Sequence, residues 1–152
     1  MCRITALAVV SIMVLMFASS VLAGEHEIAV FAGDSRYQGI SALTLGANYE
    51  YRWNATAGVG ILFEYVHGDR ITRDYVIGIP FYIHPYSGLR LAFVPLFEVN
   101  DEDDNTVNRG AVRAGIAYAL EAGSFNITPQ FNFDFRNDAV ATVYGIGFGY
   151  RF

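Results

Sequence analysis

The chain has 152 residues, the size of a single domain. Charged residues form only 16% of it, and the 15 Asp and Glu outnumber the 10 basic residues, all of them Arg, which gives a net charge of -5. Such an acidic chain disfavours nucleic-acid binding, because it lacks the positive surface that phosphates require. The 12 Phe, 10 Tyr and 15 Gly are also unusual for a cytosolic domain with so few charges.

The first residues have the pattern of a secretory signal. Arg3 precedes an apolar run over Ile4–Phe17, and a short Val-Leu-Ala motif ends the segment at Ala23. The run is short for a membrane-spanning helix, which needs roughly 20 apolar residues. We therefore expect a cleaved signal peptide at 1–23 rather than an anchor, followed by a mature domain at 24–152.

The single cysteine, Cys2, lies within this signal segment. Export leads to an oxidising compartment, where disulfides commonly stabilise small domains. The mature domain has no cysteine for a disulfide or for thiolate chemistry, so its stability must come from the fold itself.

The rest of the sequence alternates apolar and polar residues in segments of about ten residues, which is the pattern of β-strands. Clusters of Gly, Asn, Asp, Ser and Pro separate the segments, and neither a linker nor a second domain is indicated. We predict eight strands, with approximate spans Glu27–Gly33, Ser41–Trp53, Thr56–Val66, Arg73–His84, Leu89–Val99, Gly110–Ala122, Phe125–Arg136 and Ala139–Phe152.

The two faces of these strands differ in size and polarity, since side chains alternate between faces along a strand. One face carries large aliphatic and aromatic residues, as in Leu43, Leu45 and Trp53 of the second strand. The other face carries glycines and charges. Its predicted charged side chains are Glu50, Arg52, Glu64, Asp74, Arg90, Glu98, Arg113, Glu121, Asp134 and Arg136.

Volume decides which face is inside. The interior of an eight-stranded barrel is only just wide enough for its own side chains, so it can hold the glycine-rich polar face but not the large apolar one. In water, the apolar face would be a far larger patch than soluble monomers tolerate. We therefore expect an all-β, eight-stranded antiparallel up-and-down transmembrane barrel, closed because lipid cannot satisfy an open sheet edge.

The predicted connections support this topology. Outer-membrane barrels have short periplasmic turns and longer outer loops, and with both termini periplasmic the even-numbered connections should be short. They are short here, at Asn54-Ala55, His84–Gly88 and Ala122–Ser124. The first three odd connections are predicted to be longer, and the fourth is a tight turn; their spans are Asp34–Ile40, His67–Thr72, Asn100–Arg109 and Asn137-Asp138.

The mature chain resembles the small outer-membrane β-barrel proteins of the OmpA/OmpX type. The most specific feature is the last strand, Tyr144–Phe152, which alternates aromatic residues with glycines and ends in Phe. The resemblance implies that Gly147, Tyr150 and Phe152 belong to a signal for the barrel-assembly machinery. It also implies a monomer in the bacterial outer membrane, in contact with membrane lipid and lipopolysaccharide.

Two features depart from that family pattern. Pro80, Pro95 and Pro129 fall inside predicted strands, where each removes a ladder donor, so we expect bulges or shifted register there. The predicted outer loops are also shorter than the loops that family members use for adhesion, which weakens an adhesin role.

The charged inner face supports two interpretations. Charges of both signs in a narrow interior are costly unless paired, so they predict an ion-pair network that plugs the barrel. This interpretation gives the protein a structural or interaction role in the membrane. The alternative is a narrow gated path for protons or small ions.

An enzyme that modifies lipid A is the alternative from another class. Such an enzyme, a deacylase or an acyltransferase, needs its catalytic groups on the outer side, where His67 lies beside Asp69 and the nearest serines are Ser35 and Ser41. His84 is predicted in a periplasmic turn, on the wrong side for this chemistry. The residues form no compact motif, so we predict no catalytic residue and no cofactor.

Two further parts of the sequence could bind a metal ion or a small molecule. The acidic run Asp101–Asn105 could bind Ca²⁺ or Mg²⁺, but it lacks the ligand spacing and the glycine of an EF-hand, so we predict a solvated loop and no metal site. Apolar residues also occur on the inner face of strands three to five. They could line a pocket for a small lipid or hydrophobic ligand, unless register shifts at the prolines turn some outward; they are Leu62, Val76, Tyr82, Val94 and Leu96.

A soluble lipocalin-like carrier is a third option. It would require the two faces to be inverted, with the apolar face enclosing a ligand.

Overall fold

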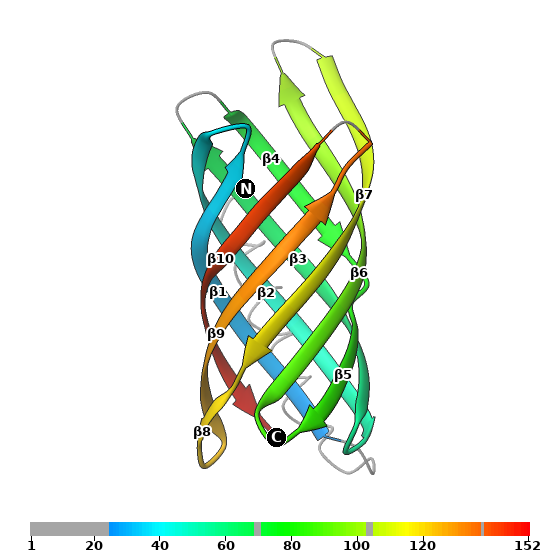
Figure 1. The fold of residues 1–152 in the computed structure, drawn as a ribbon, viewed down its shortest axis with the longest axis vertical. Coiled ribbons are helices and arrows are strands. Elements are labelled where there is room, and N and C mark those ends of the chain that lie inside the picture. Colours follow the sequence, from blue (N-terminus) through cyan, green and yellow to red (C-terminus); the bar gives the residue numbers. More distant parts are fainter. Residues whose placement is uncertain (1–24, 69–70, 103–104, 138) are drawn as a thin grey trace, which may run out of the picture.

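The computed structural model describes residues 25–68, 71–102, 105–137 and 139–152. The predicted signal peptide therefore lies outside the described residues. The described ranges contain no helix long and apolar enough to cross a membrane. They form ten strand segments in one antiparallel sheet (Figure 1): β1 (Glu25–Tyr37), β2 (Ile40–Asn54), β3 (Ala57–Gly68), β4 (Ile71–Gly78), β5 (Phe81–Tyr86), β6 (Leu89–Glu102), β7 (Asn105–Tyr118), β8 (Leu120–Ala122), β9 (Phe125–Phe135) and β10 (Val140–Arg151).

The ten segments make eight wall strands, because β4 continues into β5 and β7 continues into β8. Both β4 and β5 pair with β3 and β6, and both β7 and β8 pair with β9. The first strand pairs with β2 on one side and with β10 on the other. The sheet is thus closed, which confirms the predicted eight-stranded barrel.

The strands keep their register across the three prolines, so the predicted bulges are wrong; only Pro80 lies in a break between two strand segments. Before Pro80, Gly78 pairs with Leu62 of β3. After it, Phe81 pairs with Val59, three residues further along each strand. Pairing with β7 is continuous across Pro95, and pairing with β10 is continuous across Pro129. On the other side of each proline the pairing breaks and resumes in the same register.

The reason is the geometry of an antiparallel ladder, in which the N–H and C=O of one residue face the same neighbour. Each proline therefore loses only the bond that it would donate. Its carbonyl still accepts a bond: Gly60 donates to Pro80 over 2.9 Å, and Ile79 donates to Pro95 over 3.2 Å.

The first three outer connections are tighter than predicted. The first is a two-residue turn in which Gln38 and Gly39 have φ of 48° and 82°, the positive values of a type I′ hairpin. The segment Asp34–Tyr37, predicted as loop, continues β1, and β6 and β7 likewise extend through most of the predicted third loop, as far as Glu102 and Asn105. Backbone pairing does not require apolar side chains, so these strands continue beyond the apolar pattern from which we predicted them.

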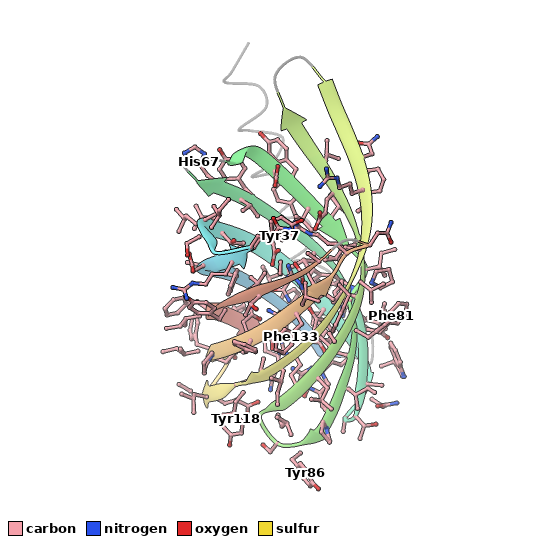
Figure 2. The ribbon with its side chains drawn as sticks, turned by 45° about the horizontal axis from the view of Figure 1, so that its top comes forward. Tyr37, His67, Phe81, Tyr86, Tyr118 and Phe133 are labelled. Carbon is pink, nitrogen blue, oxygen red and sulfur yellow. The ribbon has the colours of Figure 1, made fainter. Side chains whose placement is uncertain are left out.

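Side chains alternate between the two faces as predicted. Ile61 of β3 is 62% exposed on the outside, whereas its neighbour Leu62 is 9% exposed on the inside. Figure 2 shows Phe81 and Tyr118 directed away from the barrel wall. The large apolar residues therefore form an outer belt, and the polar face is enclosed.

Candidate functional site

The enclosed charges form the candidate site, and its upper cluster is centred on Arg113. Arg113 of β7 donates to both oxygens of Glu64 on β3, at 2.6 and 2.7 Å, and to both oxygens of Asp134 on β9, at 2.6 and 2.9 Å. The three residues are at most 3% exposed. One guanidinium thus joins three wall strands across the lumen through paired, charge-assisted hydrogen bonds.

A second ion pair lies on the outer side of this cluster. Glu98 of β6 is buried and accepts from Arg136, whose Nη2 lies 2.9 Å from its Oε1. The Arg136 guanidinium also lies 5.0 Å from the centre of the Tyr37 ring, a cation–π distance. Asp74 is half-buried on β4, which pairs with β6. These contacts connect the outer ends of β1, β6 and β9.

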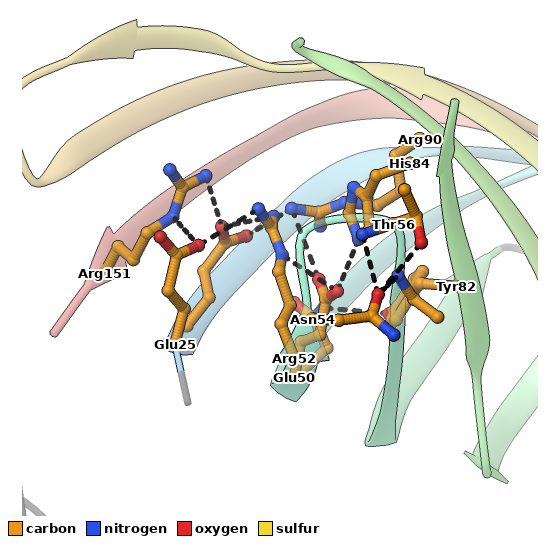
Figure 3. A network of polar contacts seen from close by, with 12 residues as sticks. Glu25, Glu50, Arg52, Asn54, Thr56, Tyr82, His84, Arg90 and Arg151 are labelled. Atoms are coloured by element: carbon orange, nitrogen blue, oxygen red, sulfur yellow. Dashed lines mark hydrogen bonds and ion pairs between the residues drawn. The ribbon is translucent and has the colours of Figure 1, made fainter. Parts of the chain in front are cut away.

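The lower network surrounds two buried glutamates, Glu27 of β1 and Glu50 of β2 (Figure 3). Arg90 of β6 bridges them, with Nη2 2.7 Å from Glu27 and 3.4 Å from Glu50. Arg52 also contacts both, at 3.3 and 3.1 Å. The Nε2 atom of His84 lies 2.6 Å from Glu50. Opposite charges therefore alternate across this end of the lumen.

Nine of the ten charged residues predicted on the inner face are placed inside the barrel, buried or half-buried. The exception is Glu121, which is exposed on β8 and pairs with Arg151 at 3.0 Å. Glu121 lies on the predicted face of its strand. However, β8 pairs only with β9, near the end of the barrel, where no opposite strand encloses the side chain. The nine are Glu50, Arg52, Glu64, Asp74, Arg90, Glu98, Arg113, Asp134 and Arg136.

Three members of the network were not predicted from the sequence: Glu27, His84 and Arg151. Glu27 accepts from Arg52, Arg90 and Arg151, and it is 2% exposed. It stands at the start of the predicted first strand, and strict alternation from Ala29 would have placed it inside. His84 was predicted at the boundary between a strand and a turn, but it lies within β5, where the Thr56 carbonyl accepts a bond from its backbone N–H.

Apolar side chains fill the lumen beside Arg113, where we considered a ligand pocket. Leu62, Val76, Val94 and Leu96 pack in one cluster, and each is at most 9% exposed. The Tyr82 hydroxyl accepts from Asn48 at 3.0 Å. Register shifts do not turn these residues outward, and their close packing means that the patch is a core rather than a pocket.

The other candidate groups are not brought together. His67 lies on the outer wall and stacks on Tyr65, with ring centres 6.1 Å apart. Ser35 is buried in the lumen, whereas Ser41 is exposed and donates to Asp34. Asp69 and the core of the Asp101–Asn105 run lie outside the described residues. Within the described residues, no group of three or more His, Cys, Asp or Glu could hold a metal ion.

Comparison with known proteins identifies the architecture. No family model and no curated protein matches the chain. Among solved structures, Ail, the attachment invasion locus protein of Yersinia pestis, matches with a TM-score of 0.61 and 14% identity, over 86% of this chain and 100% of that chain. The N-terminal β-barrel domain of Pseudomonas aeruginosa OprF matches with a TM-score of 0.59 and 17% identity, over 85% and 99%. The chain has the fold of the small outer-membrane β-barrels.

This small outer-membrane barrel fold has no single activity. Neisserial surface protein A shares it, with a TM-score of 0.55 and 8% identity over 86% of this chain and 98% of that chain. A de novo designed transmembrane β-barrel shares it as well, with a TM-score of 0.57 and 11% identity over the same shares. A fold that can be designed without a biological role does not by itself assign one.

Proposed function

We propose that this protein is a structural or interaction protein of the bacterial outer membrane, with a sealed lumen. One observation carries the proposal: the distribution of polarity is inverted relative to a soluble protein. Glu50 is 0% exposed inside the barrel, while Ile61 is 62% exposed outside it. An exposed belt of this kind is stable only in lipid, and a closed barrel supplies the backbone bonds that lipid cannot.

The filled lumen supports the sealed state. The Arg113 cluster, the Glu27–Glu50 network and the apolar core occupy the interior of a barrel that is only just wide enough for side chains. Moving an ion through it would require these buried pairs to separate, and each separation leaves an unpaired buried charge. A structural role therefore fits the lumen better than conduction.

Membrane lipid, lipopolysaccharide and the assembly machinery are the partners that we propose. Aromatic side chains such as Trp53 and Phe125 are exposed near the end of the barrel that holds the C-terminus, as expected at a membrane interface. Gly147, Tyr150 and Phe152 lie on or directly after β10, the strand that closes the barrel, and are proposed as the assembly signal.

Membrane fractionation tests the location. The protein should be recovered in the outer-membrane fraction, and unheated samples should migrate differently from boiled samples on a gel, because the closed barrel resists detergent. Recovery in the soluble periplasm would contradict the proposal and favour the carrier alternative.

Conductance in a planar lipid bilayer tests the seal. The purified protein should show no steady channels under conditions in which a porin, as positive control, conducts. Steady single-channel currents would instead establish the ion-path alternative.

The proposal does not include catalysis. Its support is the separation of the candidate groups, since Ser35 is inside the barrel, His67 is outside it, and Ser41 hydrogen-bonds to Asp34. The mass profile of lipid A should be the same with and without the gene. Loss of an acyl-chain change on deletion would assign the enzymatic alternative.

A further inference from the structure

A layer without charges separates the two charged ends of the lumen. On β6, Glu98 belongs to the outer ion pair and Arg90 to the lower network, and the inward residues between them are Ala92, Val94 and Leu96. The inward residues of the other described strand segments follow the same rule, since none between these two levels is charged. Those after Glu27 on β1 and before Glu50 on β2 are Ala29, Phe31, Gly33 and Ser35, and Asn48, Gly46, Thr44 and Ala42.

Large apolar side chains enter this layer from opposite walls. Phe31 of β1 is 6% exposed, and Val94 of β6 is 2% exposed. The strand β6 is the fourth wall strand from β1 in either direction around the barrel, so the two side chains project from opposite walls. Leu62 of β3 packs in the same buried cluster as Val94. These three residues, Phe31, Leu62 and Val94, are the apolar layer.

Glycines make room for the apolar layer. A Cβ atom at Gly33 would lie 2.5 Å from Cζ of the Phe31 ring, and one at Gly145 would lie 2.7 Å from its Cε2. Beside β6, a Cβ atom at Gly78 would lie 2.7 Å from Val94 Cγ1. The apolar side chains therefore lie directly against the backbone of the wall, and little space for water remains in the narrow lumen.

The outermost charges, by contrast, are open to solvent. The Arg136 side chain is 15% exposed towards one end of the barrel, and the Arg151 side chain is 21% exposed towards the other. Water that reaches these side chains can hydrate the ion pairs and exchange with their hydrogen bonds. Further inside it meets the apolar layer, whose members are at most 9% exposed.

We propose that the apolar layer seals the barrel against ions and protons, and does so even without the ion pairs, an inference that rests on the sealed lumen proposed above. An ion that enters the layer loses its hydration and gains no charged partner. A buried water needs about two to four polar partners, and the Asn48 amide already donates to the Tyr82 hydroxyl. Hydrophobic constrictions exclude water for this reason. Protons need a continuous chain of water, so the same layer stops them.

Conductance of the full mature protein in a planar lipid bilayer tests the apolar layer. Phe31→Ala combined with Val94→Ala shortens the layer from both walls, and this variant should show steady single-channel currents where the wild type shows none. The matched control is Val30→Ala with Phe93→Ala. It makes changes of the same kind at the adjacent outward residues, which are 55% and 53% exposed, and it should stay silent.

A neutral variant tests whether the ion pairs are needed for the seal. Glu64→Gln with Arg113→Gln and Asp134→Asn removes the three charges of the Arg113 cluster together, so that none of the three is left unpaired. This variant should be as silent as the wild type. Steady currents through it would overturn the inference, because the charges would then be part of the seal.

Gel migration without heating verifies that each variant is folded. If the protein with Phe31→Ala and Val94→Ala does not fold, Val94→Thr replaces a methyl group with a hydroxyl at nearly equal volume and should admit measurable currents. Silence of the folded layer variants, or equal currents through the outward control, would overturn the inference. Steady currents through the wild type would defeat the proposed sealed lumen instead, so the two failures are distinguishable.

Discussion

Arg113 is the cation that two buried carboxylates share. Its guanidinium is 3% exposed and is shared by the carboxylates of Glu64 and Asp134. Two acids share one base, so the cluster has no spare positive charge among these three residues. Removing the base would leave two carboxylates in a closed interior with no counter-charge, which is a much larger change than the loss of an exposed ion pair.

Arg113→Leu should lower the free energy of unfolding by about 3–5 kcal/mol, because it breaks a buried ion pair by removing one partner. Arg113→Lys should have a smaller effect, about 1.5–3 kcal/mol, since it keeps the charge but loses the paired geometry. Urea unfolding in lipid vesicles measures both. Arg109→Gln is the control, because Arg109 is on the same strand but exposed. An Arg113→Leu protein as stable as the wild type would show that the carboxylates find other partners.

Gly60 is a second residue whose role depends on close packing. A Cβ at this position would overlap the backbone oxygen of Tyr49 and approach Pro80 to 3.3 Å. We predict that Gly60→Ala lowers the free energy of unfolding by about 1–3 kcal/mol, the usual cost of overpacking. Gly110→Ala is the matched control, since a Cβ there has no atom within 4 Å. The same urea titration compares the two, and equal stabilities would mean that β2 moves freely away from β3.

At the scale of elements, β10 has two roles. It pairs with both β1 and β9, so it completes the wall. Phe152, directly after it, exchanges two backbone hydrogen bonds with His26, at 2.9 and 3.1 Å, and its ring stacks on the His26 ring at 5.6 Å. The last residue therefore seals the seam between the first and last strands.

Phe152→Ala should strongly reduce the amount of protein assembled in outer membranes, if this residue is part of the assembly signal. The backbone bonds to His26 do not need the ring, so purified protein should still fold in detergent. Quantitative blotting of outer membranes, compared with refolding yield in vitro, separates the two effects. Phe148→Ala is the control, since Phe148 is also an exposed aromatic residue of β10. Equal losses for the two variants would indicate a general packing effect.

At the scale of the whole molecule, closure determines stability in lipid. Val30 of β1 pairs with Phe148 of β10, and both side chains are more than half exposed on the outer wall. Directly paired residues of antiparallel strands have Cα atoms about 4.5–5.5 Å apart, within reach of a disulfide. The pair is therefore a direct reporter of the seam.

The double variant Val30→Cys and Phe148→Cys should form a disulfide on mild oxidation of the folded protein. The only natural cysteine, Cys2, lies in the predicted signal, so it does not complicate the readout in mature protein. Val30→Cys with Ile116→Cys is the control, because Ile116 lies on β7, and β10 and β9 separate β7 from β1 around the barrel. Gel mobility with and without reductant measures the bond. Cross-linking of the control but not of the seam pair would contradict the closed order of strands.

The sequence by itself determined the strand count, the direction of each side chain and the inversion of polarity. These follow from a period of two, which is local: Leu43, Leu45 and Trp53 fall on one face whatever their neighbours are. Volume then excludes the large face from the narrow interior. The same alternation places Glu50 and Arg113 inside, without indicating what they contact.

Only the tertiary structure decided which charged residues pair with each other and where the barrel wall ends. Arg113 meets Glu64, 49 residues earlier in the chain, because the register of four wall strands brings them to one level of the lumen. Glu121 is correctly alternating yet exposed, because the barrel ends above it. The strands keep their register at the prolines because each proline loses only its N–H donor. Its carbonyl oxygen still accepts a hydrogen bond from the neighbouring strand. Alternation is a property of one strand, whereas ion pairs and strand ends are properties of several strands packed together.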